Sequence, residues 1–126
     1  MQYNIVVLPG DGIGPEVIEE AQKVLSAISE KYEHTFNYTE DLVGGAAIDH
    51  YGVAVTEETV QQAKRSHAVL FGAVGGPKWS DPQAPVRPED GLLALRKALG
   101  LCANIRPVKA YKFLQDASPL KPALLE

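Results

Sequence analysis

Two arginines with apolar neighbours could form a binding site for a small carboxylate. Arg96 follows Leu92 and Leu93 by about one helical turn, and Arg106 lies in the apolar run 101–108. A guanidinium binds a carboxylate through two parallel N–H donors, and an isolated charge among apolar groups is costly. The leucines could then contact a branched aliphatic group. The alternative is that each arginine forms a salt bridge with one of the sixteen acidic residues.

The first glycine-rich turn follows an apolar stretch and precedes an amphipathic one. Gly10, Gly12 and Gly14 form the pattern G-x-G-x-G, and Pro15 stands where the dinucleotide fingerprint requires its last glycine. No Gly-Lys-Ser/Thr phosphate loop is present either. Two interpretations remain open: a tight turn that needs glycine dihedrals, or a turn whose backbone also lies against a ligand.

A second glycine pair stands at the end of another apolar stretch. Gly75 and Gly76 are followed by Lys78 and Trp79. Paired glycines let a backbone approach a ligand closely, and an indole can cover an apolar face. A rigid turn packed beneath Trp79 is the alternative.

The hydrophobic pattern along the chain predicts alternating strands and helices. The expected elements are a strand at 3–8, a helix at 15–31, a strand at 36–40, a short helix or turn at 44–49, a helix at 57–66, a strand at 68–74, an irregular loop at 75–88, a helix at 91–100 and a strand at 101–108. This order is typical of an α/β protein with an open, largely parallel sheet flanked by helices. Ligands bind such sheets at the carboxyl ends of the strands, where both glycine turns and Arg106 fall.

Composition excludes several classes of protein. The 126 residues, with a net charge of −4 and 45% hydrophobic residues, fit one globular domain without an electrostatic footprint for nucleic acid. The apolar runs 5–8 and 68–71 are far shorter than the roughly 20 residues that cross a bilayer. Cys102, the single cysteine, excludes an internal disulfide and is expected to be buried in the last strand. We expect a soluble, cytoplasmic protein.

Five motifs in order resemble those of the isocitrate/isopropylmalate dehydrogenase family, and within it the 3-isopropylmalate dehydrogenases. They are Leu8-Pro9-Gly10-Asp11-Gly12-Ile13-Gly14-Pro15-Glu16-Val17, Gly44-Gly45-Ala46-Ala47-Ile48-Asp49, Gly75-Gly76-Pro77-Lys78-Trp79, Arg87-Pro88-Glu89 with Gly91-Leu92-Leu93-Ala94-Leu95-Arg96-Lys97, and Asn104-Ile105-Arg106-Pro107. The likeness covers essentially the whole chain but only the N-terminal portion of the longer family members. It implies that residues 1–126 form an incomplete part of that fold, which is not a Rossmann fold.

The resemblance implies an NAD-dependent oxidative decarboxylation of 3-isopropylmalate to 4-methyl-2-oxopentanoate in leucine biosynthesis, with Mg²⁺ or Mn²⁺, by a homodimer. Arg96 and Arg106 would bind the malate carboxylates, and Leu92 and Leu93 would line the pocket for the isopropyl group. The implied NAD contacts are Ile13 near the adenosine, Gly75, Gly76, Pro77, Lys78 and Trp79 in the loop, and Glu89 beside the nicotinamide. One departure is Ser80, which separates Trp79 from Asp81 where the family motif has them adjacent.

The same resemblance places the catalytic tyrosine and lysine, the third substrate arginine and the metal-binding aspartates outside this chain. The 126 residues alone are therefore expected to be inactive. One alternative is a related β-decarboxylating dehydrogenase acting on homoisocitrate, tartrate or isocitrate, which the Leu92-Leu93 pair disfavours. Another is a non-catalytic module that binds a small dicarboxylate or a nucleotide.

Overall fold

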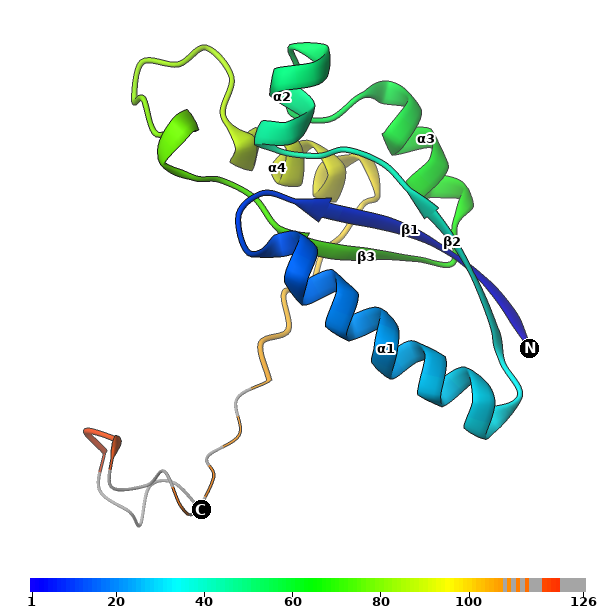
Figure 1. Cartoon of the computed structure of the whole chain (residues 1–126). Coiled ribbons are helices and arrows are strands. Elements are labelled where there is room, and N and C mark those ends of the chain that lie inside the picture. Colours follow the sequence, from blue (N-terminus) through cyan, green and yellow to red (C-terminus); the bar gives the residue numbers. More distant parts are fainter. Residues whose placement is uncertain (108, 110, 112, 114–116, 121–126) are drawn as a thin grey trace.

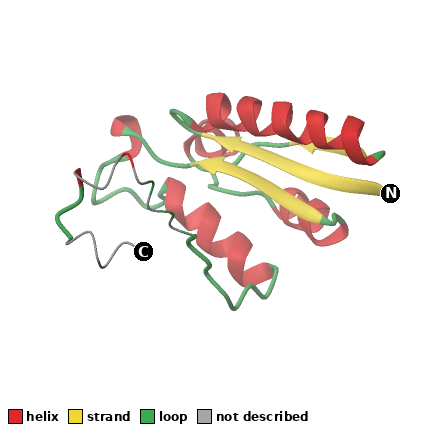
Figure 2. Ribbon diagram, turned by 90° about the horizontal axis from the view of Figure 1, so that it is seen from below, coloured by secondary structure: helices red, strands yellow, loops and turns green. Residues whose placement is uncertain are grey.

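A parallel sheet with helices on both faces forms the body of the chain (Figures 1 and 2). The computed structural model describes residues 1–107, 109, 111, 113 and 117–120, and within them the sheet has three strands in the order β2-β1-β3. The elements are β1 (Gln2–Gly10), α1 (Gly14–Tyr32), β2 (Thr35–Glu40), α2 (Gly45–Tyr51), α3 (Glu57–Arg65), β3 (Ala68–Ala73), the 3₁₀ helix η1 (Pro77–Trp79) and α4 (Pro88–Ala98). The predicted α/β class with an open parallel sheet is confirmed.

The central strand β1 is buried on both faces. Its residue Ile5 pairs with Tyr38 of β2 and with Ala68 of β3. Val7 packs on the α1 side of the sheet, and Leu8 packs on the side of α3 and α4. Both side chains are fully buried, which explains why this strand is apolar at consecutive positions rather than at alternate ones.

Capping residues set the starts of two helices. The Thr56 hydroxyl accepts the Thr59 backbone N–H at 3.1 Å, which confirms the predicted start of α3. Helix α4 begins at Pro88, three residues before the predicted start. Proline is favoured in the first turn of a helix, and the Asp90 carboxylate accepts the Arg87 backbone N–H at 2.8 Å.

The predicted strand 101–108 is wrong for the residues that the structure describes. Residues 101–107 are exposed and form no strand, while Val108 lies outside the described residues. Gly100, at a φ of +65°, ends α4, and the chain then runs away from the sheet (Figure 1). An apolar run becomes a strand only when a neighbouring strand supplies its hydrogen bonds, and this run gains none here. Cys102, expected to be buried, is exposed for the same reason.

Among the described residues, no helix combines the length and the apolar character that crossing a membrane would require.

Candidate functional site

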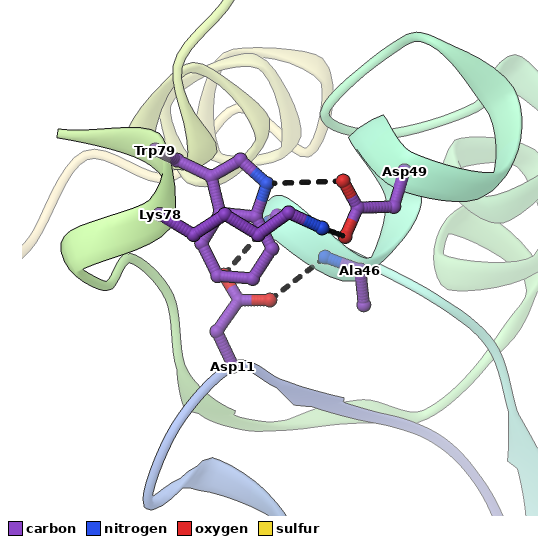
Figure 3. A network of polar contacts seen from close by, with 6 residues as sticks. Asp11, Ala46, Asp49, Lys78 and Trp79 are labelled. Carbon is purple, nitrogen blue, oxygen red and sulfur yellow. Dashed lines mark hydrogen bonds and ion pairs between the residues drawn. The ribbon is translucent and has the colours of Figure 1, made fainter. Parts of the chain in front are cut away.

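Three loops meet at the carboxyl edge of the sheet around the carboxylate of Asp11. This side chain is 5% exposed and accepts three backbone N–H groups. Ala46 donates to Oδ1 at 2.8 Å (Figure 3), Gly45 donates to Oδ2 at 2.7 Å and Gly75 donates to Oδ2 at 2.8 Å. One carboxylate therefore joins the loop after β1, the start of α2 and the loop after β3.

Glycines allow the backbone to approach this carboxylate. Gly10 has a φ of +76°, and a Cβ there would overlap the carbonyl group of Ala73. Gly44 has a φ of +73°, and a Cβ there would lie 2.6 Å from Asp11 Oδ2. The positive φ angles of Gly10 and Gly12 confirm that this turn needs glycine dihedrals, and contact of its backbone with a ligand stays a prediction. In a dinucleotide-binding loop the amides at a helix start receive a phosphate, whereas here those of α2 receive the protein's own Asp11.

The indole of Trp79 packs on the start of α2. A Cβ at Gly45 would overlap the indole ring, so only glycine leaves room for it. Asp49 of α2 accepts two hydrogen bonds from η1 (Figure 3). The Lys78 ammonium donates to Oδ2 at 2.6 Å, and the Trp79 Nε1–H donates to Oδ1 at 3.3 Å. The Lys78 ammonium also lies 5.3 Å from the centre of the indole ring. These contacts attach η1 to α2.

Acid should release the loop that carries Trp79. The hydrogen bond from Lys78 holds the pKa of Asp49 below its ordinary value of 3.8, although desolvation opposes the shift. Because folding lowers this pKa, the contact contributes fully at pH above the ordinary value and is lost as the pH falls through the lowered one. We expect Trp79 fluorescence, from the only tryptophan of the chain, to change across that range.

The control for this titration is the Asp49→Asn variant, which should show a flat Trp79 signal over the same pH range. Far-UV circular dichroism recorded in parallel separates release of the loop from unfolding. An identical acid transition in Asp49→Asn would show that another group controls the indole.

A pocket of about 450 Å³ lies between the loop after β3 and the start of α4. Its lining comprises Gly76, Trp79, Ser80, Pro82, Arg87, Glu89, Asp90 and Leu93. The Arg87 guanidinium donates to the Pro82 carbonyl oxygen at 2.7 Å, which closes the loop over the helix start. The volume falls within the range of small-molecule sites, and an aromatic plane beside a few polar groups is their usual chemistry.

The structure brings several of the predicted site residues together. Gly76, Trp79, Glu89 and Leu93 all line the pocket. Gly75 has a φ of +101° and lies next to one of these residues, because a Cβ there would be 2.9 Å from Glu89 Oε1. Residues predicted from two separate motifs thus share one cavity.

Other predicted site residues lie outside this lining. They are Ile13, which is 58% exposed before α1, Pro77 and Lys78 of η1, Leu92 and Arg96, which are half-buried on α4, and Arg106, which is exposed within 101–107. The ion pairs between described residues have only Lys23 and Lys78 as their cations, so neither arginine is held by a salt bridge there. The predicted roles of these six residues, like those of the residues that line the pocket, stay predictions.

Sequence reasoning did not assign a role to Asp11 or Asp49. An acidic residue between glycines could have suggested Asp11 as a cap for a backbone N–H group. Asp49 offered no such signal, because its partner Lys78 is 29 residues away along the chain.

The described residues offer a pocket for part of a dinucleotide but no cluster of ligands for a metal ion. No three His, Cys, Asp or Glu side chains of the described part of the chain gather closely enough to hold a metal ion. The pocket suits a planar ring, because the Trp79 indole, the Glu89 carboxylate and the glycine backbone at Gly76 line one cavity.

Comparison with known proteins gives a consistent result. The family model described as isocitrate/isopropylmalate dehydrogenase matches residues 4–126. The chain is 55% identical over 125 residues to a 3-isopropylmalate dehydrogenase of Anaeromyxobacter dehalogenans, covering 99% of this chain and 35% of that protein. It is 51% identical over 126 residues to that of Bacillus subtilis, covering 100% of this chain and 34% of that protein. The chain thus spans about a third of the length of these relatives.

Solved structures show the same likeness. A β-decarboxylating dehydrogenase from Thermococcus kodakarensis, in its apo form, has a TM-score of 0.60 and 41% identity, covering 79% of this chain and 27% of that one. An isocitrate dehydrogenase from Methylococcus capsulatus has a TM-score of 0.54 and 26% identity, covering 79% and 26%.

Proposed function

Because the chain belongs to the isocitrate/isopropylmalate dehydrogenase family, we propose that it forms the N-terminal, ligand-binding part of a 3-isopropylmalate dehydrogenase. The proposed reaction of the whole enzyme is the NAD-dependent oxidative decarboxylation of 3-isopropylmalate in leucine biosynthesis. The proposal includes a divalent metal, Mg²⁺ or Mn²⁺, a cytoplasmic location and a homodimer. Since the chain spans about a third of its relatives, it is not expected to complete this reaction alone.

The pocket is the observation that carries the proposal. Trp79 and Glu89 come from segments on either side of a long loop, and they line one cavity together with Leu93. Trp79 and Glu89 are two of the residues expected to contact NAD, and Leu93 is one of those expected to contact the isopropyl group. A cofactor ring and an aliphatic substrate must be adjacent for hydride transfer, which agrees with a shared cavity.

Each residue has a defined task in this proposal. When bound, NAD would supply the acceptor for the hydride of the hydroxyl-bearing carbon of the substrate. The Trp79 indole offers an apolar wall beside the ring, and the Glu89 carboxylate is suited to accept an N–H from the carboxamide. Arg96 and Arg106 are proposed to bind the two substrate carboxylates through paired N–H donors.

Substrate choice is assigned to the leucines of α4. Leu93 lines the pocket, and Leu92 is half-buried on α4 outside the lining. The apolar side chain of Leu93 accommodates an isopropyl group, whereas the extra carboxylate of isocitrate would lose hydration against it. The leucine pair therefore favours 3-isopropylmalate over the other substrates of the family.

Binding to the intact 126-residue chain tests the proposal. We expect NAD to quench Trp79 fluorescence and to raise the melting temperature, because a ligand that binds only the folded form stabilises it. The Glu89→Gln variant should weaken NAD binding about tenfold, the effect of losing a hydrogen bond to a charged acceptor. Glu57→Gln on α3, where the carboxylate accepts from the Gln61 side chain, removes the same charge away from the pocket and should leave binding unchanged.

The substrate is tested in the same way. A larger thermal shift with 3-isopropylmalate than with isocitrate or tartrate supports the assignment, and preference for isocitrate would overturn it. Absence of both quenching and stabilisation at millimolar NAD would contradict the cofactor assignment. A response to dicarboxylates without any response to NAD would favour the non-catalytic binding module.

A further inference from the structure

Neighbouring residues of η1 differ in their contact with the pocket. Trp79 lines the pocket, whereas Lys78 does not. The side chains of both residues are hydrogen-bonded to Asp49 of α2, one to each carboxylate oxygen (Figure 3). A carboxylate that binds two donors through different oxygens fixes the orientation of both.

We infer that Asp49 is a positioning residue for the NAD pocket, which holds the Trp79 indole as its wall and keeps the Lys78 ammonium outside. The inference rests on the proposed function for the identity of the ligand. Asp49 itself does not line the pocket, so its effect on binding passes through η1.

The packing around the indole supports this role. The face of Trp79 toward α2 lies against Gly45, where no side chain is present to hold the ring. Within the part of the chain that the structure describes, Asp49 is the only hydrogen-bond acceptor for the Trp79 Nε1–H. The indole is therefore held by Gly45 at one face, by Asp49 at its edge and by the Lys78 ammonium over its ring, and Asp49 binds both donors.

The charge of Lys78 gives Asp49 a second task. The pocket lining already contains the cation of Arg87 and the carboxylates of Glu89 and Asp90. An ammonium released from Asp49 would be attracted to these carboxylates and would compete with a ligand for Glu89. Pairing Lys78 with Asp49 at 2.6 Å prevents this competition.

The test compares Asp49→Asn with the double variant Asp49→Asn/Lys78→Gln in the 126-residue chain. We expect Asp49→Asn to raise the Kd for NAD about tenfold and to make Trp79 more accessible to acrylamide. The melting temperature should stay within about 4 °C of the unmodified chain, because the pair is exposed. Removing the lysine charge should bring the Kd back to within about threefold, since the two sites are coupled.

Three results would overturn the inference. The first is an unchanged Kd in Asp49→Asn. The second is a loss of affinity that only follows a large fall in melting temperature, which would indicate a purely structural contact. The third is a double variant that binds NAD more weakly than Asp49→Asn, which would show that Lys78 itself contacts the ligand.

Failure of the proposed function would look different. If the unmodified chain does not bind NAD, the acrylamide accessibility of Trp79 still decides whether Asp49 positions the indole. Increased quenching in Asp49→Asn, with unchanged quenching in the Glu57→Gln control, supports the positioning role, and equal quenching in all three proteins refutes it.

Discussion

Replacing Gly72 with alanine is expected to unfold the chain or to cost more than about 4 kcal/mol of its stability. Gly72 lies in β3, and a Cβ there would overlap the Pro9 carbonyl oxygen and lie 3.0 Å from the Gly14 carbonyl oxygen. Both neighbours are backbone atoms of the sheet and of the first turn of α1, so neither can rotate away. The loss would consume much of the 5–15 kcal/mol that stabilises a typical domain.

Gly76→Ala is the matched control for this substitution. Gly76 has an extended φ of 173°, and a Cβ there would lie 3.4 Å from the Trp79 ring, close to ordinary contact. We expect its stability to stay within about 1 kcal/mol of the unmodified chain. Urea unfolding followed by circular dichroism measures both variants, and equal midpoints would refute the close approach of backbone atoms at Gly72.

Replacing Asp11 with alanine is expected to destabilise the chain by about 3–6 kcal/mol. The substitution leaves the N–H groups of Gly45, Ala46 and Gly75 without their acceptor, and a buried unpaired donor costs about 1–3 kcal/mol. Asp11→Asn should also destabilise, by about 2–4 kcal/mol, because its amide group offers one acceptor oxygen where the three donors now share two.

The control for the charge is Asp81→Asn. This exposed carboxylate accepts the Gln83 backbone N–H at 2.8 Å, so the same substitution is made at a turn open to water. Its cost should be below about 1 kcal/mol. Chemical denaturation measures all three variants, and a cost for Asp11→Asn no larger than that for Asp81→Asn would show that the three loops do not depend on this carboxylate.

The elements predicted correctly from the sequence are those whose evidence is local. The run at β1 is apolar at consecutive positions because helices cover both faces, and Thr56 caps the very helix it precedes. The segment 101–107 shows the limit of such reasoning, since its composition favours a strand but says nothing of a partner. Whether a run pairs is decided by the rest of the sheet.

In the candidate site, too, some residues could be predicted from the sequence and others could not. The resemblance to a known family located Trp79, Glu89 and Leu93, and the structure places them around one pocket. Asp11 holds the loop after β3 to the loop after β1, and Asp49 holds η1 to α2. Both escaped notice because their hydrogen-bond partners lie up to 64 residues away. A carboxylate that accepts backbone N–H groups from distant loops leaves no periodic pattern in the sequence.

The central place of β1 sets a sequence of events in folding. Strand β1 precedes both of its partner strands along the chain, and each parallel pairing must wait for a helical crossover to be synthesised. The contact between Asp11 and Gly75 closes across 64 residues, so it forms after every element from α1 to β3 exists. Ligand binding should consequently appear late during refolding, well after the helices have acquired their circular dichroism signal.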